Sequence, residues 1–405
     1  MCMSESANIR VLLRNCLLAC LVLVAVASCH SGEDSHTDRT ILVYMAGDNN
    51  LCDYLNRNIR EMGSGISNRQ SHNHVVVFVD RPGKQSCLID VKRNGNDTVR
   101  VWNENLNSAS PALLSEVIDY VTGRFAADSY GLVLWSHATG WIPSSAHKFI
   151  DSGKLSAPGP KQGNGDSDRP YIRRPFEGTR AILVDNSVGS YSWMEYDEMA
   201  EAIPDSLFDF IMFDACFMGS AEVAYELRGK AHWMIASAVE VLTTGFPYDI
   251  VTEPMIDGDY ETLCRRYFDY YNSKSGDFRT AGIALINLDS YGVVADAFAD
   301  VVRNASVSVD DLSNVQCDDR FRRSVMFDLL DVAERLEPGE EYVQRMKEAL
   351  DEAIVYHANT EYVVSEIHLN RYCGLNCYIP YSRYGTVINP YYSRTEWNRR
   401  VGFIE

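Results

Sequence analysis

Two residues that could act together as a nucleophile and its base follow apolar segments of the chain. His137 ends the segment GLVLWSH (131–137), and Cys216 follows the segment FDFIMFD (208–214). If both segments are parallel strands of one sheet, their carboxyl ends meet at one edge, where sites are usually built. A thiol beside an imidazole is a nucleophile with its own base. Separately, each residue would more often be structural, so it is the pair that indicates chemistry.

The residues that follow each member of the pair favour this interpretation. Gly140 and Gly219 allow tight turns that would expose the side chains of His137 and Cys216. Cys216 also precedes a segment with helical spacing, 219–228, whose N-terminus would place positive partial charge beside a thiolate. We therefore expect a cysteine nucleophile and a histidine base at the carboxyl edge of a sheet.

The elements that would position this pair alternate along the chain. Short apolar segments predict strands buried between two helix layers, at 41–46, 74–80, 131–137, 181–185, 208–214, 233–238 and 281–287. Helical spacing of apolar residues predicts helices between them, at 51–62, 111–126, 194–203, 219–228, 259–272 and 289–303. The segments CLIDV and TVRVW flank Asn94-Gly95 and predict a β-hairpin.

This order of elements predicts an α/β fold, with a mostly parallel sheet flanked by helices on both faces. We expect this domain to span residues 40–300. The last hundred residues are helical in pattern over 321–357 and strand-like beyond it, which predicts a C-terminal α+β extension, 301–405, packed on the core.

Composition and charge exclude some classes of function. The 405 residues are 46% hydrophobic and 23% charged, as in a folded globular protein. A net charge of −19 repels nucleic-acid phosphate, so no nucleic-acid partner is expected. The chain has no Gly-rich phosphate loop. It also lacks a G-x-S-x-G elbow, which disfavours a hydrolase with a serine nucleophile.

The first 28 residues have the layout of a secretory signal peptide. Arg10 and Arg14 precede an uncharged apolar run, 15–28, that ends in small residues. The run is too short to predict a membrane span. An N-terminal anchor would be an alternative explanation of the same residues.

The sequence VASC (26–29) resembles a bacterial lipobox, in which Cys29 would carry the lipid. Cys20 is a weaker second candidate, and an ordinary signal peptide with a coincidental cysteine is the alternative. The polar, acidic residues that follow predict a solvated tether over 29–39. We therefore expect a lipid-anchored protein of the bacterial cell envelope, held on the outer membrane and facing the periplasm or the cell surface.

The motifs around the two candidate residues resemble a known family. WSHATGW (135–141) and FDACFM (213–218), with the opening strand ILVYMAGDNNL (41–51), resemble the clostripain-like cysteine peptidases of the caspase-like clan. The resemblance covers about residues 40–300, and it is the combination of motifs that is specific. It implies a caspase-like sheet, a His137/Cys216 dyad, cleavage after Arg or Lys, and activation by cleavage of an internal loop. Some members use calcium, which leaves a calcium ion open without assigned ligands, and no motif predicts a metal site.

Three further site assignments follow from the resemblance. Many relatives have glycine where this chain has Ala138, and we expect the backbone N–H groups of Ala138 and Cys216 to form the oxyanion hole. Asp214 projects to the same side of its strand as Cys216, and it matches the position that binds the Arg or Lys side chain of a substrate. Alternatively, Asp214 caps a loop or hydrogen-bonds backbone N–H groups, and Glu240 or Asp249 could share or replace its role in substrate binding.

A long polar segment, 144–180, lies between the dyad residues. It holds seven Lys+Arg against four Asp+Glu, a local charge of +3, with five Gly and four Pro. Such loops are usually functional or disordered. A peptidase that cuts after basic residues could cut itself here, and the most exposed candidates by composition are Lys148, Lys154 and Lys161, ahead of Arg173 and Arg180. Two arginines that precede proline are poor sites. A passive insertion is the alternative.

Together these features predict a cysteine endopeptidase that acts on protein or peptide substrates with Arg or Lys at the cleavage site. The principal alternative is a catalytically weak or inactive homologue that serves as a surface binding or scaffold protein. Among the cysteines outside the dyad, Cys373 and Cys377 are explained by a disulfide or by two buried free thiols.

Overall fold

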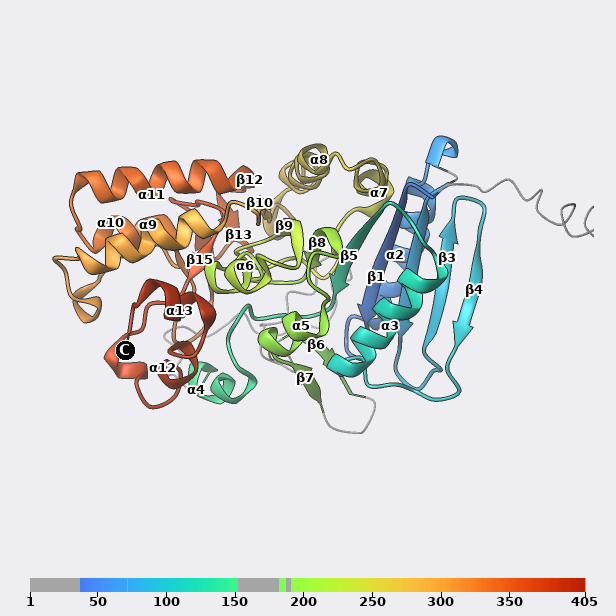
Figure 1. Ribbon diagram of the computed structural model, residues 1–405, viewed down its shortest axis with the longest axis horizontal. Helices are drawn as coiled ribbons and strands as arrows, with labels where there is room; N and C mark the ends of the chain where they lie inside the picture. Colours follow the sequence, from blue (N-terminus) through green and yellow to red (C-terminus); the bar gives the residue numbers. More distant parts are fainter. Residues whose placement is uncertain (1–36, 71, 152–181, 187–190, 405) are drawn as a thin grey trace, which may run out of the picture. The chain divides into compact units, whose positions relative to one another are not determined.

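A nine-stranded mixed sheet organises the part of the chain that the computed structural model describes, which is residues 37–70, 72–151, 182–186 and 191–404 (Figure 1). The strand order is β12-β10-β9-β8-β5-β1-β2-β3-β4. Its five central strands are parallel, namely β2 (His74–Asp80), β1 (Arg39–Ala46), β5 (Ser129–Trp135), β8 (Phe208–Asp214) and β9 (Ala231–Ala236). This centre confirms the predicted α/β fold.

Antiparallel strands extend the sheet at both edges. The predicted hairpin around Asn94-Gly95 forms β3 (Cys87–Lys92) and β4 (Gly95–Val101) beside β2. On the other edge, β10 (Gly282–Asn287) pairs antiparallel with β9, and β12 (Ile354–Asn359) pairs with β10. Only the five parallel strands at the centre therefore all have their carboxyl ends on the same side of the sheet.

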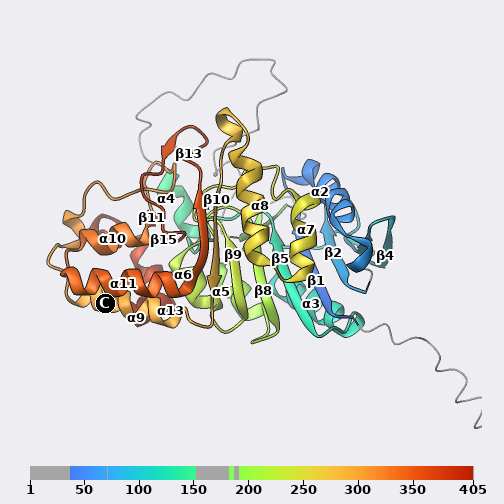
Figure 2. The same ribbon diagram turned by 90° about the horizontal axis from the view of Figure 1, so that it is seen from above.

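Helices cover both faces of the sheet (Figures 1 and 2). One face carries α2 (Cys52–Gly65), α7 (Tyr248–Asp257) and α8 (Tyr260–Asn272). The other carries α3 (Pro111–Arg124), α5 (Tyr196–Ala202), α6 (Ala221–Leu227) and α9 (Gly292–Arg303). Alternate residues of a strand point to opposite faces, so in β1 the side chains of Ile41 and Val43 enter one core, and those of Leu42 and Tyr44 enter the other.

Two segments differ from the sequence-based expectation. The strand expected at 181–185 forms β6 (Ile182–Asp185), but it pairs with β7 (Ser192–Met194) outside the main sheet. The segment expected to begin a loop at 144 instead forms a 3₁₀ turn (Ser144–Ala146) and α4 (His147–Asp151). Ala146 and Ile150 are fully buried there, and this burial explains the local helix.

The residues after 300 are part of the same core. β12 joins the main sheet, and it follows α10 (Leu329–Arg335) and α11 (Glu340–Ala353). Trp397 of α13 (Glu396–Val401) stacks on Phe298 of α9, with ring centroids 5.6 Å apart. Shorter elements complete this part: β11 (Phe327–Asp328), β13 (Tyr362–Val363), β14 (Ile367–His368), β15 (Asn376–Cys377) and α12 (Asn389–Tyr392).

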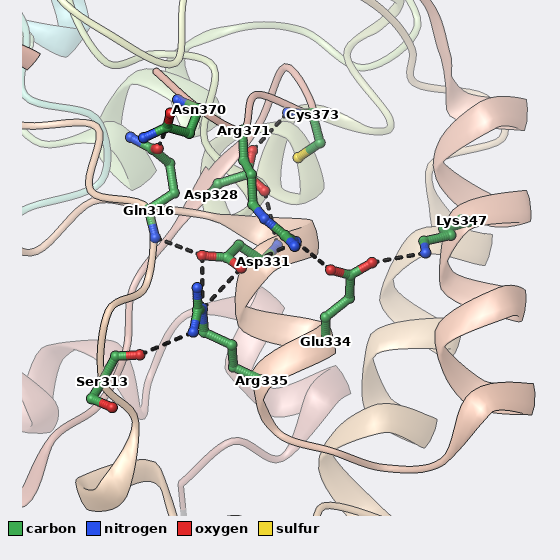
Figure 3. A network of polar contacts seen from close by, with 10 residues as sticks. All are labelled: Ser313, Gln316, Asp328, Asp331, Glu334, Arg335, Lys347, Asn370, Arg371 and Cys373. Atoms are coloured by element: carbon green, nitrogen blue, oxygen red, sulfur yellow. Dashed lines mark hydrogen bonds and ion pairs between the residues drawn. The ribbon is translucent and has the colours of Figure 1, made fainter. Parts of the chain in front are cut away.

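A buried carboxylate ties α10 to its surroundings (Figure 3). Asp331 is 1% exposed, and it accepts hydrogen bonds from the Gln316 backbone N–H at 2.6 Å and from Arg335 Nε at 2.9 Å. Arg371 Nη1 lies 3.2 Å from the same carboxylate and also pairs with Glu334. Because donors surround the carboxylate, its burial is compatible with a stable fold.

The structure decides between a disulfide and two free thiols for Cys373 and Cys377. Each of the seven cysteines from Cys52 onward is a free thiol, so Cys373 and Cys377 are two buried thiols rather than a disulfide.

In the described ranges no helix is both long enough and apolar enough to cross a membrane.

Candidate active site

The two strands that carry the candidate dyad are neighbours in the sheet. Trp135 of β5 pairs in register with Asp214 of β8. His137 and Cys216 each lie two residues beyond this pair, at the same height on the carboxyl edge. The Ser136 N–H donates to the Asp214 carbonyl oxygen at 3.4 Å, which continues the contact past the strands. Since paired strands lie about 4.8 Å apart, the sheet brings the two predicted residues to adjacent positions.

The thiol of Cys216 is held by the backbone of the loop after β9. The Val241 N–H donates to Cys216 Sγ at 3.3 Å, and Sγ lies 3.5 Å from the Val241 carbonyl oxygen. Cys216 keeps part of its surface exposed, but burial of the thiol raises its pKa to about 12, and the charge of Glu240 adds to this. The group is therefore a thiol at neutral pH and needs a base to react.

The helix expected to favour a thiolate does not do so. α6 begins at Ala221, five residues after Cys216, and it is seven residues long. Because the partial charge of a helix acts within its first turn, it gives this thiol little support. The expected lowering of the Cys216 pKa is wrong, since burial raises it.

His137 is positioned by a residue that sequence analysis did not select. Its Nε2 lies 2.6 Å from Asn50 Oδ1, in the loop after β1. An amide oxygen can only accept, so Nε2 carries the proton in this contact, and Nδ1 carries the lone pair of a neutral ring. β1 pairs with β5, with Met45 opposite Trp135. A polar residue just past a strand beside β5 was the signal that could have identified Asn50.

We predict that Asn50→Ala lowers kcat for peptide hydrolysis by on the order of 10- to 100-fold with little change in KM, because the imidazole loses its orientation. Asn50→Asp keeps an acceptor at Oδ1 and should recover much of the loss. Steady-state kinetics over pH 5 to 9 would check this, since a displaced imidazole also changes the pH profile. An Asn50→Ala enzyme with parental kcat would show that this contact does not orient the base.

The neighbouring residue Asn49 has a local structural role. Its Oδ1 accepts the Leu51 N–H at 2.9 Å, in the turn just before α2. Its Nδ2 donates to the carbonyl oxygens of Ala46 and Val184, at 2.9 and 2.8 Å. Asn49 thus connects the loop after β1 to β6.

Asp214 is buried beneath the loop between β9 and α7. It is 5% exposed, and its Oδ2 accepts hydrogen bonds from the Phe246 N–H at 3.1 Å and the Tyr248 hydroxyl at 2.9 Å. Burial raises its pKa to about 6, so it is charged at neutral pH. Gly245 has φ +67°, and a Cβ there would lie 2.6 Å from Oδ2. Only glycine therefore allows the loop to approach this carboxylate so closely.

The two other acids considered for substrate binding are placed differently. Glu240 is 5% exposed and receives two hydrogen bonds from Arg320, at 2.8 and 3.2 Å. An internal cation therefore already satisfies Glu240. Asp249 lies in the first turn of α7 and is exposed.

The backbone around the dyad bears on the oxyanion hole. Ala138 has no positive φ, whereas Gly140 has φ +61°, so alanine fits its position without strain. Ala138 forms an antiparallel bridge with Ile182 of β6. Phe217, directly after Cys216, has φ +60°, which non-glycine residues rarely adopt, and its N–H donates to the Val239 carbonyl oxygen. The role of Ala138 and Cys216 as oxyanion donors stays a prediction.

The remaining predicted residues lie at or beyond the edges of the described ranges. Lys148 is an exposed residue of α4, so cleavage after it would require this helix to open. Lys154, Lys161 and Cys29 lie outside the residues that the structure describes.

Glu222 of α6 is a buried acid. It is 1% exposed, accepts the Tyr378 N–H at 2.9 Å, and burial raises its pKa to about 7. Because the folded protein holds this proton more tightly than the unfolded chain does, ionisation of Glu222 lowers stability as the pH rises from about 4.5 to about 7.

We predict that Glu222→Gln leaves the Tm unchanged at pH 5 and raises it at pH 8, by an amount equivalent to at most roughly 3 kcal/mol. Glutamine keeps the acceptor for the Tyr378 N–H without a buried charge. Thermal unfolding at pH 5, 6, 7 and 8 would measure the difference from the parent. A variant that is less stable than the parent at pH 8 would contradict the prediction.

Known proteins resemble this chain in both sequence and fold. The clostripain family model matches residues 43–153 and 164–393, well beyond the range of the motifs. Clostripain of Hathewaya histolytica is 26% identical over 252 residues, which is 54% of this chain and 42% of that protein. The match therefore spans about two fifths of that relative.

Two solved structures cover nearly the whole described chain. The structure of an inactive zymogen C11 protease from Parabacteroides distasonis is 27% identical, with a TM-score of 0.74, and covers 90% of this chain and 98% of its own. A secreted C11 cysteine protease from Bacteroides thetaiotaomicron, solved with an irreversible peptide inhibitor, is 24% identical, has the same TM-score, and covers 91% and 100%. These likenesses confirm the predicted caspase-like fold. Because the family model matches most of its residues, the chain belongs to the clostripain family of cysteine peptidases.

Proposed function

We propose that this protein is a cysteine endopeptidase that cleaves peptide bonds after Arg or Lys. The observation that supports the proposal is the register of β5 and β8, in which Trp135 pairs with Asp214, two residues before His137 and Cys216 respectively. Asp214 is the last residue of β8 and lies two residues before Cys216. The family match over most of the chain supports the same assignment.

The reaction follows from these groups. Cys216 Sγ attacks the substrate carbonyl carbon while His137 takes the thiol proton, and the resulting oxyanion is held by backbone N–H donors. Collapse of this intermediate breaks the C–N bond, and His137 passes its proton to the leaving amine. A water molecule, deprotonated by His137, then hydrolyses the thioester and restores the thiol.

Asp214 gives the site its preference for basic side chains in this proposal. Both of its hydrogen bonds end on Oδ2, so a substrate cation would be recognised through Oδ1. The carboxylate is 5% exposed, and a charge pair in such a setting is worth more than one in water. Glu240 is less suited to this task because Arg320 already occupies its carboxylate.

We also propose that the enzyme is activated by self-cleavage within 144–180. The segment 144–180 supports this, because it lies between the two proposed catalytic residues and carries a local charge of +3. The similar Parabacteroides distasonis protein was solved as an inactive zymogen. Attachment of lipid at Cys29, and with it a place in the cell envelope, rests on the N-terminal sequence.

The specificity is tested with four fluorogenic peptides that differ only in the residue before the cleaved bond: Arg, Lys, Leu and Glu. We expect kcat/KM for Arg and Lys to exceed that for Leu and Glu by about 100-fold or more, since a buried charge would be left unpaired by the others. Equal rates for all four would contradict the specificity. Failure to cleave any of them, before or after processing, would favour the inactive scaffold instead.

Self-cleavage has its own readout. Intact-mass spectrometry of the purified protein should show two fragments that appear with time, with the new terminus following Lys148, Lys154 or Lys161. A chain that stays whole while it hydrolyses the Arg peptide would contradict activation by self-cleavage without affecting the proposed specificity. Incorporation of an alkyne fatty acid in cells, absent in Cys29→Ala, would test the lipid.

A further inference from the structure

The loop between β9 and α7 contacts both the nucleophile and the C-terminal part of the chain. Its Val241 lies against Cys216 Sγ, to which the Val241 N–H donates at 3.3 Å. The residue before it, Glu240, is bound by Arg320, eighty positions later in the chain. The residues after 300 therefore reach the immediate neighbour of the residue that contacts the thiol.

Arg320 and Glu240 form a buried ion pair with two hydrogen bonds. Arg320 Nε donates to Glu240 Oε2 at 2.8 Å, and Nη2 donates to Oε1 at 3.2 Å. The two side chains are 10% and 7% exposed. Two hydrogen bonds between planar groups fix orientation as well as distance. This pair therefore holds the loop at Glu240 in one position.

The segment that carries Arg320 is itself held by a buried carboxylate. Asp319 is 5% exposed, and it accepts the backbone N–H of Phe321 at 2.9 Å and those of Val325 and Met326 at 2.7 Å each. Three donors on one carboxylate fix the turn that follows it. Arg320 therefore extends from a well-anchored part of the backbone.

The same segment also contacts the residue that follows the nucleophile. The ring of Phe321 packs on that of Phe217, with centroids 5.2 Å apart. Phe217 directly follows Cys216 and has φ +60°, a strained conformation that persists only where the surroundings hold it. Residues 319–321 thus support the backbone beside Cys216 from two directions.

We propose that Arg320 is a positioning residue for the nucleophile, which holds Glu240 and thereby keeps the Val241 backbone against Cys216 Sγ. The inference rests on the proposed peptidase function. Without the arginine, the buried carboxylate must take a proton or move to water, and either outcome removes the hydrogen bonds that hold the loop. A displacement of about 1 Å near reacting groups can cost on the order of 100-fold in rate.

The charges of the pair also act on the thiol. Burial is the largest cause of the raised pKa of Cys216, the charge of Glu240 adds to it, and the charge of Arg320 opposes it. Removing the arginine would leave the negative charge unbalanced, so the thiol would become harder to ionise. This effect acts in the same direction as the loss of position.

Arg320→Met tests the proposal by steady-state kinetics with the fluorogenic peptides. We expect kcat to fall by about 10- to 100-fold for the Arg and Leu peptides alike, with KM changed by less than about threefold. The preference for Arg should be kept, because Asp214 is held by Phe246 and Tyr248 at the other end of the loop. A parental kcat in Arg320→Met would overturn the proposal.

Two matched variants separate position from stability. Arg335→Met removes another arginine that pairs with a buried acid, Asp331 (Figure 3). Glu366→Gln removes the exposed partner of Arg320, which lies 3.1 Å from its Nη1. Both variants should keep kcat within about twofold. An equal loss of kcat in Arg335→Met would mark a general effect on the fold and would overturn the positioning role.

Glu240→Gln and the double variant with Arg320→Met test whether the arginine acts through the glutamate. If it does, the two losses in kcat are not additive, and the double variant loses no more than about the larger single loss. Additive losses would overturn the link between the two residues.

Hydrogen exchange tests the same contact without substrate, and so separates it from the proposed function. In Arg320→Met, peptides covering 238–244 should exchange several-fold faster than in the parent and in Arg335→Met. Unchanged exchange there would overturn the proposal, whereas a parent that cleaves no peptide would contradict only the peptidase function. If Arg320→Met does not fold, Arg320→Lys keeps the charge without the planar fork, and it should show smaller effects in the same direction.

Discussion

Replacing Cys216 by alanine is expected to lower kcat/KM for an Arg peptide by about 10⁴-fold or more, while the protein stays folded. Loss of the nucleophile in a related catalytic arrangement costs on the order of 10⁶-fold in kcat. The fold should tolerate the change because the contacts that Cys216 Sγ makes are with the backbone of Val241. Fluorogenic hydrolysis and thermal unfolding of the same preparations would measure both effects.

The matched control for this variant is Cys264→Ala. Cys264 is also a buried free thiol, but it lies in α8, in the core on one face of the sheet. We expect this variant to lose some stability and to keep kcat within about twofold, because it touches no reacting group. Equal turnover by the Cys216→Ala protein and its parent would exclude Cys216 as the nucleophile. Loss of activity in Cys264→Ala, with full activity in Cys216→Ala, would also exclude Cys216 as the nucleophile.

The second large effect is expected for Asp214→Asn. A carboxylate that pairs with the substrate cation in a buried setting is worth several kcal/mol, so kcat/KM for an Arg peptide should fall by about 100- to 1,000-fold. Hydrolysis of the Leu peptide should change much less. Asparagine Oδ1 can still accept from the Phe246 N–H and the Tyr248 hydroxyl, so the loop should remain in place.

The pH dependence provides an independent test of the same residue. Burial raises the pKa of Asp214 to about 6, so the carboxylate is lost as the pH falls through that value. The ratio of kcat/KM for Arg to that for Leu should therefore drop between about pH 7 and pH 5 in the parent, and should be flat in Asp214→Asn. Ionisation of this buried acid also disfavours the folded state above its ordinary pKa. The variant should therefore be at least as stable as the parent at pH 8.

Asp209→Asn is the control for position on the strand. Asp209 lies at the amino end of β8 and pairs with Arg39 at 2.8 Å, on the opposite edge of the sheet from the dyad. We expect it to keep the preference for Arg over Leu. If Asp209→Asn and Asp214→Asn reduced the Arg preference equally, the effect would be one of fold, and Asp214 would lose its proposed role.

The parallel centre of the fold, and the candidate dyad that we propose, were predicted from local patterns in the chain. Strands such as 74–80 and 208–214 have continuous apolar stretches, at 75–79 and 210–213, which predict burial between helix layers. His137 and Cys216 come directly after two such strands. Neither inference needs knowledge of which distant residues meet.

Features that depend on distant contacts could not be predicted from these patterns. Glu240 is satisfied by Arg320, eighty positions away, and nothing near Glu240 in the chain indicates this. α7 was not expected, and Pro254 lies inside it, but Val251 and Met255 are buried in the core on one face of the sheet, and this burial stabilises the helix nonetheless. β6 has the composition of a central strand, yet its bonds to Ser136 and Asn49 place it across the strand ends. In each case a tertiary contact outweighs the local preference.

The pairing of β5 with β8 would join the two chains of a processed protein. A cut within 144–180 would leave His137 on one polypeptide and Cys216 on the other, with the paired edges of β5 and β8, from Gly131 opposite Phe210 to Trp135 opposite Asp214, as the interface between the two chains. Neither fragment would contain both proposed catalytic residues. The mature protein would be an obligate two-chain particle, whose inactivation by mild denaturant would coincide with dissociation of its chains.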